Sequence, residues 1–212
     1  MPGNFENRNS TLETGCRRYL ELFRPDRMAE SVEAIDPAEL LGLGIEALLI
    51  DLDNTLVPWH GYDVSDAVLG WLRNVESQGM KVCIVSNTRY PGRLKKLAEK
   101  LEVPFIKGRL KPRKSAFRPA LELLKADVKN TAVIGDQILT DILGGNRLGL
   151  YTILVRPRSR REFFGTRISR IIEKAILRAL SPVAGEGVQL PPRQQEMREQ
   201  SPGGGSQSKA EQ

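Results

Sequence analysis

Two aspartates, Asp51 and Asp53, directly follow the apolar run Ala47-Leu48-Leu49-Ile50. Residues two positions apart in an extended chain project to the same side, about 6.5–7 Å apart along the backbone. Two carboxylates at this spacing repel each other, and a hard cation that takes oxygen from one or both of them offsets the repulsion. The chemistry then available is nucleophilic attack by one carboxylate and proton transfer by the other.

Three further polar clusters occur in the chain, namely Ser86-Asn87-Thr88, Lys111-Pro112, and Gly135-Asp136-Gln137 with Asp141 beyond it. The first and the last of these end apolar runs, at 82–85 and 131–134. A lone pair of aspartates is typical of a solvated turn, but several sheet-end clusters in one order are hard to obtain by chance. Because ligands bind open α/β sheets at the carboxyl ends of their strands, the clusters predict one shared site.

In this order the clusters resemble the four motifs of the haloacid dehalogenase-like (HAD) phosphohydrolases, over residues 45–160. The resemblance implies that Asp51 is the nucleophile, which forms an aspartyl-phosphate, and that Asp53 is the general acid and base. It also implies that Ser86, Asn87 and Lys111 bind the phosphoryl group.

The same resemblance implies a Mg²⁺ ion held by Asp51, Asp53 and Asp136, with Asp53 contributing its backbone carbonyl. Thr55 and Asp141 would have supporting roles. Positioning and positive charge supply most of the catalysis of phosphoryl transfer, because negative charge is spread over the phosphoryl oxygens in the transition state.

A narrower resemblance rests on Asp51-Leu52-Asp53-Asn54-Thr55-Leu56-Val57 and on the segment 135–149, which reads GDQxxTDxxGGNRxG. These segments look like the YqeG-type family (HAD subfamily IIIA), whose relatives include the mitochondrial phosphatidylglycerophosphate phosphatases. The chain departs from the family at Thr88, where asparagine is usual, and at Leu110, where a small residue is common. Neither departure removes a catalytic group.

The elements that must position these residues alternate along the chain. Apolar runs predict strands at 47–50, 82–85, 103–106, 131–134 and 151–155, and helical spacing predicts helices over 63–78, from 91 to 101 and over 115–125. This alternation predicts an α/β fold with a doubly wound, Rossmann-type parallel sheet. Only 32 residues separate Asp53 from Ser86 and 24 separate Ser86 from Lys111, so we expect no large cap domain and an open site.

For two other features a structural role is favoured over a functional one. His60 is the only histidine, which argues against a histidine metal cluster or a Ser/His/Asp triad, and we expect it at the rim without a catalytic duty. Gly144-Gly145 resembles a phosphate-cradling loop only superficially, and we expect it to close a turn.

The net charge of +6 is concentrated near the end of the predicted domain. Residues 156–178 contain eight basic and two acidic residues, and the isoleucines of this segment recur at helical spacing. A basic amphipathic helix can bind an anionic membrane surface, each basic residue contributing about 1 kcal/mol, or it can pack on the sheet as a terminal core helix. The two interpretations are compatible.

The 212 residues, with 40% hydrophobic content, are enough for one substantial core. We expect three parts: an N-terminal segment, 1–44, packing on the domain; the HAD-like domain, 45–180; and a disordered Pro/Gly/Gln/Ser-rich tail, 181–212. An apolar stretch of membrane-spanning length and a signal-peptide pattern are both absent, which favours a cytoplasmic protein, peripherally membrane-associated if the basic helix binds lipid. Of the cysteines Cys16 and Cys83, the latter is expected to be a buried thiol.

The sequence therefore predicts a Mg²⁺-dependent phosphatase. The family resemblance favours phosphatidylglycerophosphate as the substrate, and hence a role in phospholipid biosynthesis. The alternatives are a phosphatase of a protein or nucleotide phosphate, and a non-catalytic phosphate-recognising protein that binds RNA or a protein. The basic run 107–114 lacks interleaved aromatics, so nucleic acid is not the expected partner. The oligomeric state is left open.

Overall fold

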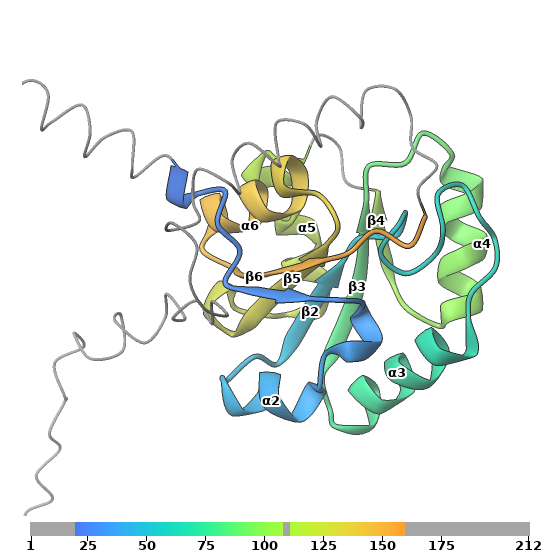
Figure 1. The fold of residues 1–212 in the computed structure, drawn as a ribbon, viewed down its shortest axis with the longest axis horizontal. Helices are drawn as coiled ribbons and strands as arrows, with labels where there is room; N and C mark the ends of the chain where they lie inside the picture. The colour runs from blue at the N-terminus through green and yellow to red at the C-terminus, as the bar shows by residue number, and fades with distance from the viewer. Residues whose placement is uncertain (1–19, 108–110, 160–212) are drawn as a thin grey trace, which may run out of the picture.

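The computed structural model describes residues 20–107 and 111–159. Its centre is a parallel sheet of six strands in the order β1-β6-β5-β2-β3-β4 (Figure 1). The strands are β1 (Arg27–Ala29), β2 (Ala47–Ile50), β3 (Lys81–Ser86), β4 (Phe105–Lys107), β5 (Thr131–Gly135) and β6 (Tyr151–Val155). The predicted doubly wound α/β fold is confirmed.

Helices cover both faces of the sheet (Figure 1). They are α2 (Pro37–Gly42), α3 (Asp66–Ser77), α4 (Pro91–Leu101), α5 (Arg118–Leu124) and α6 (Leu143–Leu148). Side chains of α2, α3 and α4 pack with Leu48 and Ile50 on one face, and α5 packs with Leu49 on the other. Successive residues of β2 therefore enter two different cores, as the unbroken apolar run requires.

The connections between the motif-bearing strands are short. The first, from β2 to β3, contains only α3 as regular structure, and the second, after β3, contains α4 and β4. Within the described residues neither connection contains an inserted domain. The expectation that the site has no large cap is thus confirmed.

Several element boundaries differ from the predicted ones. Helix α3 begins at Asp66 because the Ser65 hydroxyl accepts a hydrogen bond from the Val68 N–H, which caps the helix there. The single helix expected over 115–125 is a 3₁₀ turn, Lys114–Ala116, followed by α5. Proline at the second position of α5, Pro119, fits the first turn of a new helix and not the middle of a continuing one.

The expectation that Gly144-Gly145 closes a turn was wrong. Both glycines lie inside α6, and both are buried. A Cβ on Gly144 would come within 2.7 Å of the Phe117 ring, and one on Gly145 would collide with Val133 of β5. The glycines therefore let α6 pack closely against the sheet and against Phe117, which lies between the 3₁₀ turn and α5.

The first described segment adds a strand that the sequence did not predict. Strand β1 pairs with β6 in parallel, and Val32, Ile35 and Leu40 enter the core cluster of the α3 face. The Trp71 indole N–H of α3 donates to the Ile35 carbonyl at 2.7 Å. This segment thus forms one edge of the sheet.

Three sequence predictions concern parts of the chain outside the described residues: most of the basic segment 156–178, the tail 181–212 and Cys16. Cys83 is buried in β3, and burial raises the pKa of its thiol to about 12. Among the described residues, none of the helices has both the length and the apolar composition needed to cross a bilayer.

Candidate active site

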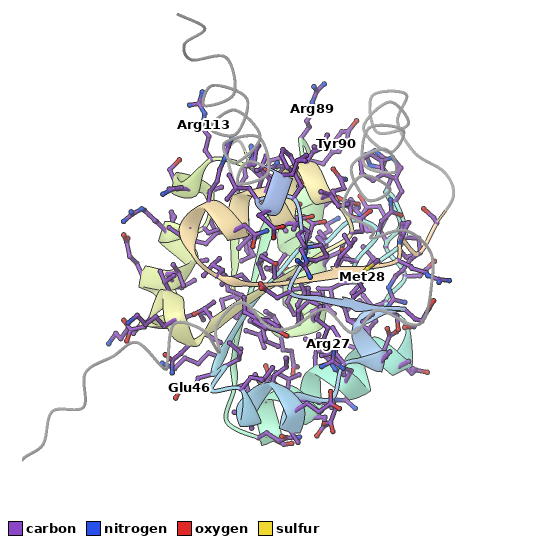
Figure 2. All side chains as sticks on the ribbon, turned by 60° about the vertical axis from the view of Figure 1, so that its left-hand side comes forward. Arg27, Met28, Glu46, Arg89, Tyr90 and Arg113 are labelled. Carbon is purple, nitrogen blue, oxygen red and sulfur yellow. The ribbon has the colours of Figure 1, made fainter. Side chains whose placement is uncertain are left out.

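The strand register brings the predicted motifs to one end of the sheet. Ile50, the last residue of β2, pairs with Ile84 of β3 on one side and with Ile134 of β5 on the other. Asp51 therefore follows the central strand at the level where both neighbours end. In Figure 2, Arg89 and Tyr90, which follow β3, lie at the opposite end of the molecule from Glu46, which precedes β2.

A cavity of about 310 Å³ opens at this end. Six of the predicted site residues line it: Asp51, Asp53, Ser86, Asn87, Lys111 and Asp141. Thr55 and Asp136 are both buried. The structure thus collects side chains that lie as far as 90 positions apart in the sequence, from 51 to 141.

Lys111 joins two of the carboxylates. Its ammonium donates to Asp51 Oδ1 at 2.6 Å and to Asp141 Oδ1 at 2.8 Å. The Lys111 and Asp141 side chains are only 1% and 2% exposed. A buried ammonium between two carboxylates is compensated in charge and hydrogen-bonded, which is the arrangement that a buried ion requires.

The pKa values of this group follow from burial and charge. Burial raises the pKa of Asp51 to about 7; Lys111 opposes this rise, and the negative charge of Asp141 adds to it. Burial would lower the pKa of Lys111, but the charges of Asp141 and Asp51 outweigh it and raise that pKa above its usual value. Lys111 is therefore a permanent cation, whereas Asp51 can exchange a proton near neutral pH.

Asp141 reaches Lys111 because of its local backbone. It lies on a π-helical turn, Ile138–Ile142, directly after the β5 motif, and its Oδ2 accepts from the Gln137 N–H at 3.3 Å. Its carboxylate occupies the space that a Cβ on Gly135 would need. Such π turns are frequent at functional sites, and glycine at 135 is required for this approach.

The acidic residues fit a hard cation. Asp51, Asp136 and Asp141 each offer a carboxylate oxygen, and these atoms all lie within 4.8 Å of one another. Among the described residues no histidine or cysteine takes part in this cluster. Oxygen ligands alone suit Mg²⁺ and not Zn²⁺, so the donor set agrees with the ion that the sequence predicts.

The remaining predicted residues support this geometry. Asn87 Oδ1 accepts from the Lys111 N–H at 3.2 Å, which ties the lysine to the end of β3. Ser86 is buried, and its hydroxyl accepts from the Thr88 N–H at 3.2 Å. Thr55 is buried, and its carbonyl accepts from Arg158 Nε at 2.7 Å.

Arg93 is a site residue that the sequence interpretation missed. Its Nη1 lies 2.9 Å from Asp53 Oδ1 and 3.1 Å from Asp53 Oδ2. Its Nε and Nη2 donate to the Gly61 carbonyl at 3.1 Å and 2.7 Å. The Asp53 carboxylate is thus engaged by an arginine of α4 and lies outside the cluster of Asp51, Asp136 and Asp141.

The sequence interpretation also missed two residues, Arg158 and Ser159, that contact the loop after Asp53. Arg158, after β6, is 2.6 Å from Glu33 as well as donating to Thr55, and the Ser159 hydroxyl donates to Asn54 Oδ1 at 2.7 Å. Asn54 adopts a left-handed backbone with φ of 63°, which asparagine tolerates better than most residues. The first residues of the basic segment therefore contact the loop that carries the predicted site residues.

His60 lies beside the cavity within a small aromatic group. Its ring is 4.8 Å from that of Trp59 and 5.4 Å from that of Tyr90, in edge-to-face geometry, and its backbone N–H donates to Asp53 Oδ1 at 3.3 Å. All three rings line the cavity. The predicted rim position of His60 agrees with this placement.

One signal in the sequence could have indicated Arg93. Arg93 precedes Leu97 by one helical turn and therefore belongs to the same stripe of α4 as the buried leucines. Arginine is rarely fully buried unless it is paired, so its position on an apolar stripe predicts an acidic partner. Which acid that is depends on the three-dimensional contact.

Comparisons with known proteins agree with this geometry. Residues 109–161 match the family model described as HAD-hydrolase-like. The chain is 39% identical over 160 residues to a Bacillus subtilis protein named probable phosphatase YqeG, an alignment that covers 76% of this chain and 92% of the relative.

Solved structures with a similar fold are more distant. A protein of Listeria monocytogenes is 21% identical, with a TM-score of 0.45, and the match covers 63% of this chain and 97% of the other. The 3-deoxy-D-manno-octulosonate 8-phosphate phosphatase of Yersinia pestis is 18% identical, with a TM-score of 0.43, and the match covers 68% of this chain and 86% of the other.

Proposed function

The chain belongs to the HAD-like phosphatase family, and from this premise we propose that it is a Mg²⁺-dependent phosphomonoesterase that works through an aspartyl-phosphate. The observation that carries the proposal is the group at the end of β2, where Lys111 contacts Asp51 and Asp141 beside the Asp136 carboxylate. This group combines a nucleophile, a fixed cation and oxygen ligands for a metal at one end of the sheet.

In the proposed reaction an Asp51 oxygen attacks phosphorus, and the bond from phosphorus to the leaving oxygen breaks. Asp53 gives its proton to that oxygen, so the alcohol leaves neutral. Asp53 then takes a proton from a water molecule that attacks the aspartyl-phosphate, which releases phosphate and regenerates Asp51. Lys111, Ser86 and Asn87 hold the phosphoryl oxygens during both steps.

The metal would be held by Asp51 and Asp136, with the Asp53 backbone carbonyl as a third oxygen. When bound, Mg²⁺ supplies positive charge that offsets the repulsion between the phosphate and the Asp51 carboxylate. Asp141 supports the group by holding Lys111.

For the substrate we propose phosphatidylglycerophosphate, which would be converted to phosphatidylglycerol. The motifs around Asp51 and Asp136 that resemble the YqeG type support this choice, and so do the short connections beside the cavity. A site without a cap suits a phosphate carried on a larger body, such as a lipid headgroup at a membrane surface.

The charge of residues 156–178 supports docking on an anionic membrane, although most of this segment lies outside the described residues. Replacing Arg160, Arg161, Arg167 and Arg170 by glutamine should lower activity on vesicle-borne substrate far more than on a soluble ester. Sedimentation with anionic vesicles should weaken with salt, because the Debye length falls from about 10 Å at 0.1 M to about 3 Å at 1 M. Equal losses on both substrates would contradict membrane docking.

A phosphate-release assay tests the proposed function as a whole. The panel contains phosphatidylglycerophosphate in vesicles, a phosphopeptide, a mononucleotide and p-nitrophenyl phosphate, each with and without Mg²⁺. Strong preference for the lipid supports the proposed substrate, and preference for the peptide or nucleotide replaces it. No Mg²⁺-dependent release from any of them would contradict an enzymatic function and favour a phosphate-recognising protein.

A further inference from the structure

Arg93 and Asp53 form a buried contact that none of the family motifs accounts for. The Arg93 side chain is 3% exposed and that of Asp53 is 12% exposed. The guanidinium has two partners: its Nη1 contacts both oxygens of Asp53, while Nε and Nη2 both donate to the Gly61 carbonyl. Arg93 therefore connects the Asp53 carboxylate to the loop that follows it, at Gly61.

Burying these two charged groups costs desolvation free energy, so stability alone does not explain why they are present. A buried charge must be paired and hydrogen-bonded, and an apolar residue of similar volume often gives equal or greater stability. Position 93 lies on the buried stripe of α4 beside Leu94 and Leu97, whose other members are apolar. The contact thus points to a function of arginine beyond the packing of α4.

The surroundings of Arg93 restrict the position of the carboxylate. The Arg93 guanidinium carbon lies 5.7 Å from the centre of the Tyr62 ring, and the His60 N–H donates to Asp53 Oδ1. Asp53 Oδ1 thus has two donors, at 2.9 Å from Arg93 and 3.3 Å from His60, whereas Oδ2 has the Arg93 contact at 3.1 Å. This arrangement restricts the plane of the carboxyl group, with more donors on Oδ1 than on Oδ2.

We propose that Arg93 is a positioning residue for proton transfer by Asp53. It holds the Asp53 carboxyl group and the loop at Gly61 as one unit, so that Asp53 reaches the leaving oxygen in the first step and the attacking water in the second. The inference rests on the proposed phosphatase function. Arg93 itself need not touch the substrate, and it acts through Asp53.

The leaving group provides the test. An alkyl phosphate such as β-glycerophosphate releases a strongly basic alkoxide that needs a proton, whereas p-nitrophenyl phosphate releases a stable anion that does not. In Arg93→Gln, kcat/KM for the alkyl ester should fall about 10²-fold, the lower end of what general acid catalysis supplies. For the aryl ester kcat/KM should stay within about threefold, because kcat/KM reports only the steps up to aspartyl-phosphate formation.

The second step gives an independent readout. With the aryl ester, kcat of Arg93→Gln should fall while aspartyl-phosphate, trapped with hydroxylamine, accumulates above the wild-type level. This follows because water attack still requires a positioned Asp53. Arg93→Lys keeps the charge but replaces the planar guanidinium by a single ammonium, so it should hold Asp53 and Gly61 together less well and fall between Arg93→Gln and wild type in both readouts. It also provides a second variant if Arg93→Gln fails to fold.

Lys96→Gln is the matched control, since it removes one positive charge from an exposed position of the same helix and should behave as wild type. Equal losses on the two esters in a folded Arg93 variant, without aspartyl-phosphate accumulation, would overturn the inference and leave Arg93 a structural residue. A wild-type protein that hydrolyses neither ester and releases phosphate from no member of the substrate panel would instead contradict the proposed function, on which the inference depends.

Discussion

The two motif carboxylates, Asp51 and Asp53, lie two residues apart but are held by different parts of the molecule. Asp51 contacts Lys111, and Lys111 in turn contacts Asp141, which follows strand β5. Asp53 is held from the helix side, by Arg93 of α4. The first arrangement depends on strand ends that must meet in a parallel sheet, and the second on one helix contact and one loop.

This difference separates two tasks. The Asp51 group contains three neighbouring carboxylates and one lysine, which contacts two of them, and this excess of acidic groups favours a further cation. The Asp53 group contains one acidic side chain and one arginine, so it offers no cluster of carboxylates to a cation. We therefore expect the Asp51 side to bind metal and phosphate, and the Asp53 side to transfer protons.

The largest expected effect comes from removing the nucleophile. Asp51→Asn should reduce phosphate release to background, because an amide cannot attack phosphorus. Asp53→Asn should slow turnover about 10²–10⁴-fold, the usual contribution of general acid and base catalysis. Full activity of a well-folded Asp51→Asn protein would contradict the assignment of Asp51 as the nucleophile.

Metal removal should be nearly as severe but reversible. Chelation should silence the enzyme and Mg²⁺ should restore it, because the oxygen ligands suit a hard cation. Asp136→Asn should raise the Mg²⁺ concentration needed for half-maximal rate, whereas Lys96→Gln should not. Undiminished activity after exhaustive chelation would contradict the placement of a metal on the Asp51 side.

Much of the Asp51 side could be predicted from the sequence. Apolar runs ending in Asp51, Ser86 and Asp136 identify strands with polar residues at their carboxyl ends, and the parallel topology then requires the ends to meet. The lysine followed from motif order. Its bridge to Asp141 requires Gly135, whose role is visible only once the π-helical turn is built.

The Asp53 side could not be predicted in the same way. Arg93 lies 40 positions from Asp53, and which acid it meets depends on how α4 packs over the loop. Strand β1 escaped prediction for a similar reason, since three residues at a sheet edge carry too short a pattern. Gly144-Gly145 was misinterpreted because helix packing and turn formation use the same residue type.

A stability measurement sharpens the comparison further. In the metal-free protein at about pH 8, Lys111→Met should cost about 3–5 kcal/mol, because it leaves two buried carboxylates without their cation. The control is Lys95→Gln, which removes an exposed pair with Glu99 at 3.8 Å and should cost about 0–1 kcal/mol. Urea unfolding monitored by circular dichroism measures both. Similar costs for the two variants would mean that the Lys111 group is not buried as described.

The smallest expected effect is a dependence of Mg²⁺ affinity on pH. Burial raises the pKa of Asp51 from 3.8 to about 7, so in the metal-free protein this carboxyl keeps its proton at pH values where an ordinary aspartate has lost it. Only the ionised form binds a metal. Affinity should therefore rise about tenfold per pH unit as the pH approaches 7 from below, and level off above it, since one pKa unit corresponds to about 1.36 kcal/mol.

Calorimetry at about pH 6, in two buffers with different ionisation enthalpies, should detect about one proton released per Mg²⁺ bound, and almost none well above the pKa of Asp51. The Asp51→Asn variant should bind the ion more weakly and with little dependence on pH, because the titrating ligand is gone. Asp53→Asn should keep the wild-type slope, because Asp53 offers the ion only its backbone carbonyl. A slope that disappears in Asp53→Asn and persists in Asp51→Asn would reverse the assignment of the two sides, and the metal would then belong with Arg93 and Asp53.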